Sequence, residues 1–290
     1  MIRLNLFDTS FAHTQATNGI DCAGLAAPAQ IKWIRNQGEW DGITVFTESI
    51  LYAANLPLIK QVKSKYKIAW ILEPPEIRDA FDFVVQNRDV FDYVCSSYEP
   101  PPALASKHLI TPFGGYWVSD NVDIDTKKFC CSYIMSGKGK GMHGGPAGYS
   151  MRWECLKMIE ERADTFAIPV VPCGGAFKHL ETKDSALESY MFSVVIENSK
   201  HNHYFTEKIN DCFRKKVVPI YWGSPYISNY YDERGIITFS TPEELFSILQ
   251  SLTTQDYFDK IKSIEANHTL VQDSVPENYL FNSLGRVGLI

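Results

Sequence analysis

Residues 191–222 read MFSVVIENSKHNHYFTEKINDCFRKKVVPIYW, and this stretch decides the fold class. The apolar, β-branched run at its start predicts a buried strand, and a similar run at its end predicts a second one. Between them lie a polar loop and an amphipathic segment of helical period. A strand, loop, helix and strand in this order form the unit of a parallel α/β sheet. The loop after the first strand then lies at the carboxyl edge of the sheet, where open α/β folds bind ligands.

Short apolar runs alternate with segments of helical period through the rest of the 290 residues, so we expect an α/β protein. The length favours two domains over one. Residues 100–125 have little helical period and contain PPP and TPFGG, so we expect them to join the domains. The expected parts are an N-terminal domain at 1–120, a C-terminal domain at 121–270 and a tail at 271–290.

The individual elements follow from the same patterns. We expect strands at 2–7, 42–47, 67–72, 92–97, 128–136, 167–172, 190–196, 217–222 and 235–239, and helices at 28–37, 55–65, 150–162, 182–188, 207–216 and 241–252. Thr241 is the expected N-cap of the last helix, with Pro242 at its first position.

Composition excludes several classes of protein. A formal charge of -6 and a pI near 5.7 argue against nucleic acid as a partner, because nucleic-acid binders usually carry a basic field. The seven cysteines are scattered, without a C-x-x-C pair, which favours reduced thiols and a cytoplasmic location. No apolar run approaches the roughly 18 residues that a transmembrane segment needs.

The polar loop and the helix after it suggest an anion site. Thr206 is well suited to cap the helix, which places Glu207 and Lys208 in its first turn. Free backbone N–H groups and the helix dipole favour an anion there, and a lysine suits this position best if a phosphate lies in front of it. A solvated first turn is the alternative. His201 and His203 lack a third ligand of suitable spacing, so we expect no metal site.

Other nucleotide-binding motifs are poor matches. No G-x-G-x-x-G follows the first strand. The glycine-rich stretch SGKGKGMHGG, residues 136–145, never spells G-x-x-x-x-G-K-[ST], so we interpret it as a mobile loop rather than a P-loop.

The segment FSVVIENSKHNHYFTEKINDCFRKKVVPIYWGSP, residues 192–225, resembles the donor-binding motif of the α1,3/α1,4-fucosyltransferases, glycosyltransferase family 10, and its YWGSP is especially close to bacterial members. That family has F-x-x-x-[FI]-E-N-S, then Y-[IV]-T-E-K, a helix, and a strand with V-P-[IV]-x-x-G. The matching residues here are Phe192, Glu197, Asn198, Ser199, Tyr204, Thr206, Glu207, Lys208, Pro219 and Gly223. Phe205 departs from the family's usual Ile or Val.

Weaker resemblances lie upstream in the expected order. KKFCCSYIMS, a helix with Arg152, and PVVPCGG are similar to the family's K-F-C strand, its helix-borne arginine and its V-D-x-x-G-G segment. In the N-terminal domain, WILEPPEI resembles the family's E-S-P segment at a strand end. The resemblance covers about residues 126–250 well and the first 115 residues thinly.

The resemblance implies a GT-B fold, with two Rossmann-like domains facing across a cleft and GDP-fucose held mainly by the second. The donor-binding residues that it implies are Arg152 and Lys208 on the diphosphate, Glu207 on the ribose, and Asn198 and Tyr204 lining the donor site.

Glu73, in the acceptor-side domain, is the implied general base, with Glu76 or Glu48 as alternatives. Inverting transfer needs a carboxylate to take the proton of the acceptor hydroxyl. The leaving diphosphate gains charge, which two cations and a helix N-terminus can stabilise. We therefore expect an enzyme that needs no cofactor and no metal.

The expected function is the inverting transfer of fucose from GDP-fucose to a hydroxyl of a glycan acceptor. The expected partners are the nucleotide sugar and the acceptor, with peripheral contact to a lipid-linked glycan. Two alternatives stay open: a related transferase that uses another nucleotide sugar, and a non-catalytic protein of the same fold that binds a glycan or a nucleotide.

Overall fold

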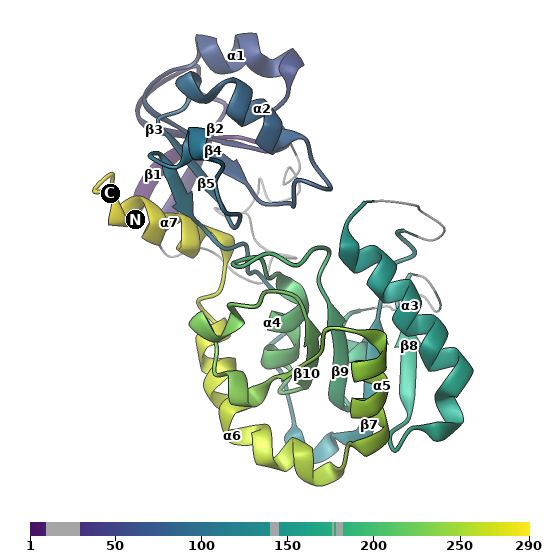
Figure 1. Ribbon diagram of the computed structural model, residues 1–290. Coiled ribbons are helices and arrows are strands. Elements are labelled where there is room, and N and C mark those ends of the chain that lie inside the picture. The colour runs from purple at the N-terminus through teal and green to yellow at the C-terminus, as the bar shows by residue number, and fades with distance from the viewer. Residues whose placement is uncertain (10–29, 140–144, 176, 178–181) are drawn as a thin grey trace. The chain divides into compact units, whose positions relative to one another are not determined.

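The computed structural model describes residues 1–9, 30–139, 145–175, 177 and 182–290. The chain forms two compact units, each built around one parallel sheet (Figure 1). The first unit comprises Met1–Gly115, His201–Tyr204 and Val275–Ile290, and the second comprises Tyr116–Lys200 and Phe205–Ser274.

The first unit contains a six-stranded parallel sheet of order β2-β1-β3-β4-β5-β6. The expected strands 2–7, 42–47, 67–72 and 92–97 are confirmed. The bounds are β1 Ile2–Phe7, β2 Ile31–Arg35, β3 Glu39–Thr47, β4 Lys63–Ile71, β5 Tyr93–Ser96 and β6 His108–Ile110.

The predicted helix at 28–37 is wrong over residues 31–35, which form strand β2, and residues 28–29 lie outside the described part. Ile31 and Trp33 are buried while Lys32 between them is exposed, so the segment has the period of two that suits a half-buried strand. Pairing with β1 satisfies the backbone groups of this edge strand that face β1. The helix expected at 55–65 also ends early, because β4 begins at Lys63.

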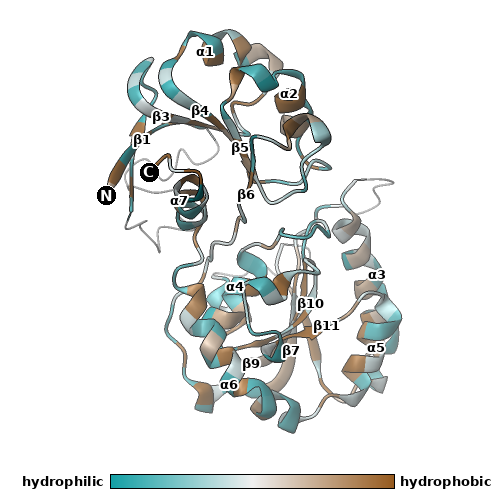
Figure 2. Ribbon diagram, turned by 60° about the vertical axis from the view of Figure 1, so that its left-hand side comes forward, coloured by the Kyte–Doolittle hydropathy of each residue, from teal (hydrophilic) through white to brown (hydrophobic). Residues whose placement is uncertain are grey.

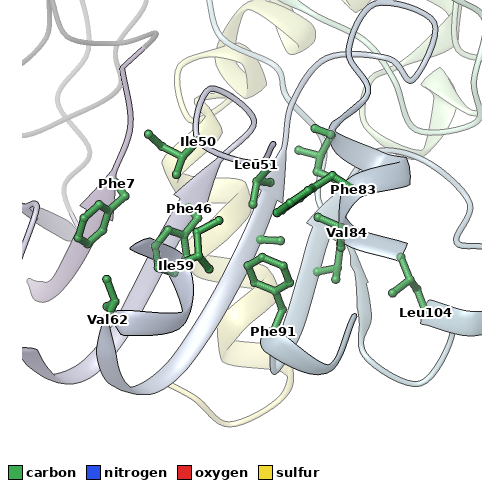
Figure 3. Close-up of a cluster of buried hydrophobic side chains, with 14 residues drawn as sticks. Phe7, Phe46, Ile50, Leu51, Ile59, Val62, Phe83, Val84, Phe91 and Leu104 are labelled. Atoms are coloured by element: carbon green, nitrogen blue, oxygen red, sulfur yellow. The ribbon is translucent and has the colours of Figure 1, made fainter. Parts of the chain in front are cut away.

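Hydrophobic side chains cover both faces of this sheet, as expected for buried parallel strands. One core cluster joins Phe7, Phe46 and Phe91 to residues of α1 (Leu56–Gln61) and α2 (Ala80–Gln86), as Figure 3 shows. A second cluster joins the strands to Leu280 and Leu284 of α7 (Pro276–Arg286). Short 3-10 helices lie at Ala53–Asn55, Arg88–Val90 and Pro102–Leu104.

The contacts divide the chain differently from the expected 1–120, 121–270 and 271–290. The first unit ends at Gly115, and Val275–Ile290 belongs to it rather than forming a separate tail. The physical reason is the apolar face of α7, because Leu280 and Leu284 are both 0% exposed.

The second unit contains a five-stranded parallel sheet of order β11-β10-β9-β7-β8. In Figures 1 and 2, α3 and α5 lie on one side of this sheet, and α4 and α6 on the other. The bounds are β7 Lys128–Ile134, β8 Val170–Cys173, β9 Tyr190–Ile196, β10 Val218–Trp222, β11 Ile237–Thr238, α3 Ala147–Arg162, α4 Glu207–Arg214, α5 Pro242–Ser251 and α6 Thr254–Val271.

Several expected features of the second unit are confirmed, among them its five strands and the N-caps Thr206 and Thr241, whose hydroxyls accept hydrogen bonds from first-turn amides. Near 182–188 the chain forms only a 3-10 helix, Asp184–Ala186. Sequence periodicity did not indicate α6, which begins with a capping box between Thr253 and Asp256. Other 3-10 helices are Ile124–Thr126, Ala163–Thr165, Ile227–Asn229 and Glu233–Gly235.

The strand order fixes where each sheet can bind a ligand. In the second sheet, β7 lies between β8 and β9, so the connections after β7 and after β9 leave in opposite directions. The carboxyl ends of β7 and β9 therefore flank the topological switch point at which open α/β sheets bind ligands. In the first sheet, β1 and β3 flank the corresponding point. Within the described ranges, no helix is long and apolar enough to cross a membrane.

The substitution Leu284→Ala should destabilise the first unit by about 2–5 kcal/mol, because it opens a cavity beneath the sheet. The matched control is Leu58→Ala in α1, a leucine that is 40% exposed. Urea-induced unfolding of the two variants measures the difference. Equal losses of stability would show that α7 does not complete this core.

Candidate active site

A buried carboxylate anchors the start of α4. Glu197, the first residue after β9, is 0% exposed. Its Oε1 accepts a hydrogen bond from the Thr206 backbone N–H at 2.9 Å, and its Oε2 accepts one from the Thr206 hydroxyl at 2.8 Å. Lys208 Nζ donates to the same Oε2 at 3.2 Å. Glu197 thereby fixes both the cap of the helix and the lysine of its first turn.

Lys208 and Glu207 lie side by side in this first turn. Lys208 Nζ is 3.5 Å from Glu207 Oε1 and 2.8 Å from the Thr206 hydroxyl oxygen. Burial alone would raise the pKa of Glu207, but the charges of Lys208 and Lys183 outweigh it and lower the pKa to about 2. Glu207 is therefore a firmly ionised hydrogen-bond acceptor at neutral pH.

Lys183, in the segment after β8, is a second cation beside this turn. Its Nζ lies 2.6 Å from Asp211 Oδ2 and 3.9 Å from Glu207 Oε1. Burial opposes its charge, yet Asp211 and Glu207 together raise the pKa of Lys183 above its ordinary value. Asp211 is itself 0% exposed and accepts a hydrogen bond from the Trp117 backbone N–H at 2.7 Å. Lys183 has no signal in the sequence, because only the fold brings it to α4.

Arg152 and Asn198 meet at the carboxyl end of β9. The Arg152 side chain is buried, and its Nε and Nη2 donate to the Ile196 carbonyl oxygen at 3.1 and 2.6 Å. Nη2 also donates to Asn198 Oδ1 at 2.8 Å. The helix that bears Arg152 starts at Ala147, three residues before the expected start. The structure therefore places Arg152 and Asn198 together at the switch point.

Two glycines let the chain pack closely around the residues after β9. A Cβ on Gly148, in the first turn of α3, would lie 1.8 Å from the Glu197 carbonyl oxygen, and the Gly148 N–H donates to the Asn198 carbonyl at 2.9 Å. A Cβ on Gly223, just after β10, would lie 2.8 Å from Glu197 Cγ. Glycine is required at both positions because a side chain would displace Glu197.

The described charges of the second unit's site are balanced. Arg152, Lys183 and Lys208 supply three cations, and Glu197, Glu207 and Asp211 supply three carboxylates. An incoming anion therefore meets cations whose positions are already set, together with the positive end of a helix dipole. Such an arrangement suits a phosphate group flanked by hydroxyls.

The first unit holds Glu73 immediately after Leu72, at the carboxyl end of β4. Its backbone N–H donates to Glu48 Oε2 at 3.0 Å, and the Leu72 N–H donates to the same oxygen at 2.5 Å. Glu48 is 9% exposed, whereas Glu73 is half-buried and Glu76 is exposed. Of the three carboxylates considered for the base, Glu48 is thus committed to backbone amides.

The segment His201–Tyr204 packs with the first unit. His201 Nε2 lies 3.1 Å from Glu76 Oε1, and its ring contacts the Tyr98 ring edge-on at 4.7 Å. The Tyr204 ring stacks on Tyr98 at 5.8 Å and is 1% exposed. The Tyr204 ring therefore packs against an aromatic side chain of the first unit.

The expectation of no metal site is compatible with the described residues, among which no group of three or more His, Cys, Asp or Glu side chains could hold an ion. Metal independence stays a prediction. The glycine-rich loop at 136–145 is also untested, because residues 140–144 lie outside the described part.

Comparison with solved structures shows the type of fold. Crystal structures of an α1,3-fucosyltransferase align with 93% of this chain and 89–90% of their own chains. The TM-score is 0.58 at 14% identity for one structure, and 0.55 at 13% identity for the structure titled as a complex with GDP-fucose. The predicted α/β fold of the GT-B type is thereby confirmed.

Sequence comparison finds a family match over part of the chain. Residues 154–267 match the family model described as "Glycosyltransferase family 10 (fucosyltransferase) C-term". The curated relatives include an α-(1,3)-fucosyltransferase of Helicobacter pylori, 28% identical over 96 residues, or 30% of this chain and 20% of the relative. A GDP-fucose protein O-fucosyltransferase 3 of Bos taurus is 31% identical over 114 residues, or 32% of this chain and 24% of the relative.

This chain therefore matches glycosyltransferase family 10 over residues 154–267, as the sequence motifs predicted. It spans about a fifth to a quarter of the length of these two curated relatives. The matched region contains β9, α4 and β10, and with them Glu197, Glu207 and Lys208, whereas Arg152 lies just before it.

The lowered pKa of Glu207 predicts a loss of stability in acid. Because the folded-state pKa is about 2 and the ordinary value is 4.5, ionised Glu207 stabilises the fold above pH 4.5, and this stabilisation is lost as the pH falls through 2. Glu207→Gln should remove a pH-dependent stabilisation on the order of 2–3 kcal/mol.

The free energy of unfolding, measured from pH 6 to 2, tests this expectation. The control is Glu243→Gln, an exposed glutamate in the first turn of α5. If Glu207→Gln and the control show the same pH dependence as the unsubstituted protein, the lysines do not hold Glu207 ionised.

Proposed function

We propose that this protein is an inverting fucosyltransferase that moves fucose from GDP-fucose to a hydroxyl of a glycan acceptor. The observation that carries the proposal is the geometry of the first turn of α4, which contains Glu207 and Lys208. The buried Glu197 carboxylate holds this turn through hydrogen bonds from Thr206 and Lys208. All of these residues lie in the region that matches family 10. Two of the similar crystal structures are of an α1,3-fucosyltransferase with GDP and with GDP-fucose, which supports this choice of donor.

In this proposal the second unit binds the donor. Lys208 and Arg152 pair with the diphosphate, and the N-terminal amides of α4 add the positive end of the helix dipole. Glu207 accepts hydrogen bonds from the ribose hydroxyls, and Asn198 orients Arg152 while lining the donor site. A role for Tyr204 in donor binding is the least supported, since its ring is buried against Tyr98.

The first unit supplies the general base in this proposal. The Glu73 carboxylate takes the proton of the acceptor hydroxyl while the oxygen attacks C1 of fucose from the face opposite GDP. One C–O bond forms as the bond from C1 to the β-phosphate oxygen breaks, so the configuration at C1 is inverted. The departing GDP gains negative charge, which Lys208, Arg152 and the helix dipole stabilise more in the transition state than in the ground state.

Cations supplied by the protein can take the place of a metal ion in this reaction, so we propose that the enzyme needs neither metal nor cofactor. We also propose that the enzyme is cytoplasmic. Its proposed acceptor is a saccharide that contains N-acetylglucosamine or glucose, including one carried on a lipid at a membrane surface.

A panel of nucleotide sugars tests the donor. GDP-fucose should raise the melting temperature of the protein and should be hydrolysed or transferred, whereas UDP-sugars should do neither. Lys208→Ala should weaken GDP binding by about 10- to 100-fold, because it removes a charge-assisted contact. Lys157→Ala in α3, whose lysine side chain is 76% exposed, is the control and should leave binding unchanged. Stabilisation by a UDP-sugar instead of GDP-fucose would refute the proposed donor.

Glu73→Gln tests the base. The substitution preserves shape but removes the proton acceptor, so transfer should fall by about 10²–10⁴-fold while GDP binding stays nearly unchanged. Glu76→Gln is the matched control, because Glu76 is exposed and pairs with His201. Transfer rates and GDP titrations of both variants decide the assignment, and undiminished transfer by Glu73→Gln would move the role to another residue.

A further inference from the structure

A network of polar contacts joins the carboxyl ends of three neighbouring strands in the first sheet. Asp8, after β1, accepts hydrogen bonds from the hydroxyls of Thr47 and Ser49 at the end of β3. Glu48 lies between these two residues, and its Oε2 accepts the N–H groups of Leu72 and Glu73 after β4. The network therefore runs from β1 through β3 to the backbone of the proposed base.

The geometry at Glu48 is that of a carboxylate bound by two successive backbone amides. Both N–H groups point at one oxygen, 2.5 and 3.0 Å away, so the peptide planes on either side of Leu72 are held relative to β3. The Cα of Glu73 follows directly, and its side chain projects from a backbone that cannot turn without breaking these bonds. Burial strengthens the constraint, because water cannot replace Glu48 as the acceptor.

We infer that Glu48 is a positioning residue for Glu73: its carboxylate fixes the backbone that carries the base, and its negative charge repels that of the Glu73 carboxylate. The inference rests on the proposed function, in which Glu73 takes the proton of the acceptor. Glu48 itself does not touch the substrate in this scheme, because its carboxylate faces the amides of the neighbouring strand end.

The groups around Glu48 determine how its charge depends on pH. Glu73 and Arg78 face it from the segment after β4, Tyr98 faces it from the segment after β5, and Asp8 binds the residues on each side of it. Burial raises the pKa of Glu48 to about 7. The two backbone hydrogen bonds and the charge of Arg78 act in the opposite direction and lower this pKa, but burial has the larger effect. Glu48 thus becomes charged near neutral pH, and its charge then repels that of the Glu73 carboxylate.

Two substitutions separate the two parts of this role. Glu48→Gln keeps an oxygen that can accept both amides but removes the charge, whereas Glu48→Ala removes both. Glu39→Gln, at the exposed start of β3, is the control. For each variant we would measure kcat, KM for GDP-fucose, the pH profile of transfer from pH 5 to 9, and the rise in melting temperature with GDP.

We expect Glu48→Gln to lower kcat by about 3- to 10-fold at neutral pH, with an unchanged KM for GDP-fucose and an acid limb moved to lower pH. Glu48→Ala should lower kcat by about 10²-fold through misplacement of Glu73. Both should keep the GDP-induced rise in melting temperature, which shows that the second unit is folded.

The outcomes distinguish this inference from the proposed function. The positioning role is refuted, and the proposed function stands, if the unsubstituted protein transfers fucose and neither variant differs from it. In that case Glu48→Gln shows the same pH profile as the unsubstituted protein, and Glu48→Ala shows the same kcat. If Glu48→Gln abolishes transfer while Glu73→Gln stays active, Glu48 is the base and the inference is wrong. If the unsubstituted protein transfers no fucose from GDP-fucose, the proposed function fails, and the inference falls with it.

Discussion

The hydrogen bonds between the Glu197 carboxylate and Thr206 are the interaction on which the candidate donor site depends. They join the end of β9 to the start of α4 across a loop of eight residues, so the length and composition of that loop matter little to the geometry of the helix start. Lys208 is held by the same carboxylate, and Gly148 and Gly223 leave the space that it needs. A buried carboxylate with three donors is stable because its desolvation is compensated by those bonds.

The cations of this site are preorganised by carboxylates rather than left in solvent. Lys183 and Lys208 both lie near Glu207, and Arg152 is fixed by the carbonyl of Ile196 and by Asn198. A ligand with phosphates alone would have to compete with these internal partners, whereas one with phosphates and hydroxyls can use the carboxylates too. The paired charges therefore favour a nucleotide over a simple anion, and in the proposed reaction they would keep the cost of reorganisation low.

Local sequence signals predicted a large part of this structure, and the failures have physical reasons. Thr206 was predictable as a cap because capping depends on a few adjacent residues. Strand β2 was not, since a segment as short as IKWIR fits both periods and its pairing with β1 decides the outcome. Lys183 and the anchoring role of Glu197 were missed because both are defined by side-chain contacts between elements, which the pattern within one element does not show. The sequence motif included Glu197, but it did not indicate that the Glu197 side chain binds Thr206 and Lys208.

The place of α7 in the first unit bears on how the protein is made. The sheet of that unit is complete by Ile110, yet Leu280 and Leu284 arrive about 170 residues later in synthesis. Until then the apolar side chains that Leu280 and Leu284 pack against lack this cover, and exposed apolar surface is what chaperones bind and what drives aggregation. The second unit can complete its own sheet and helices earlier, because Tyr116–Ser274 contains all of them. Folding on the ribosome would then finish with the unit that was begun first.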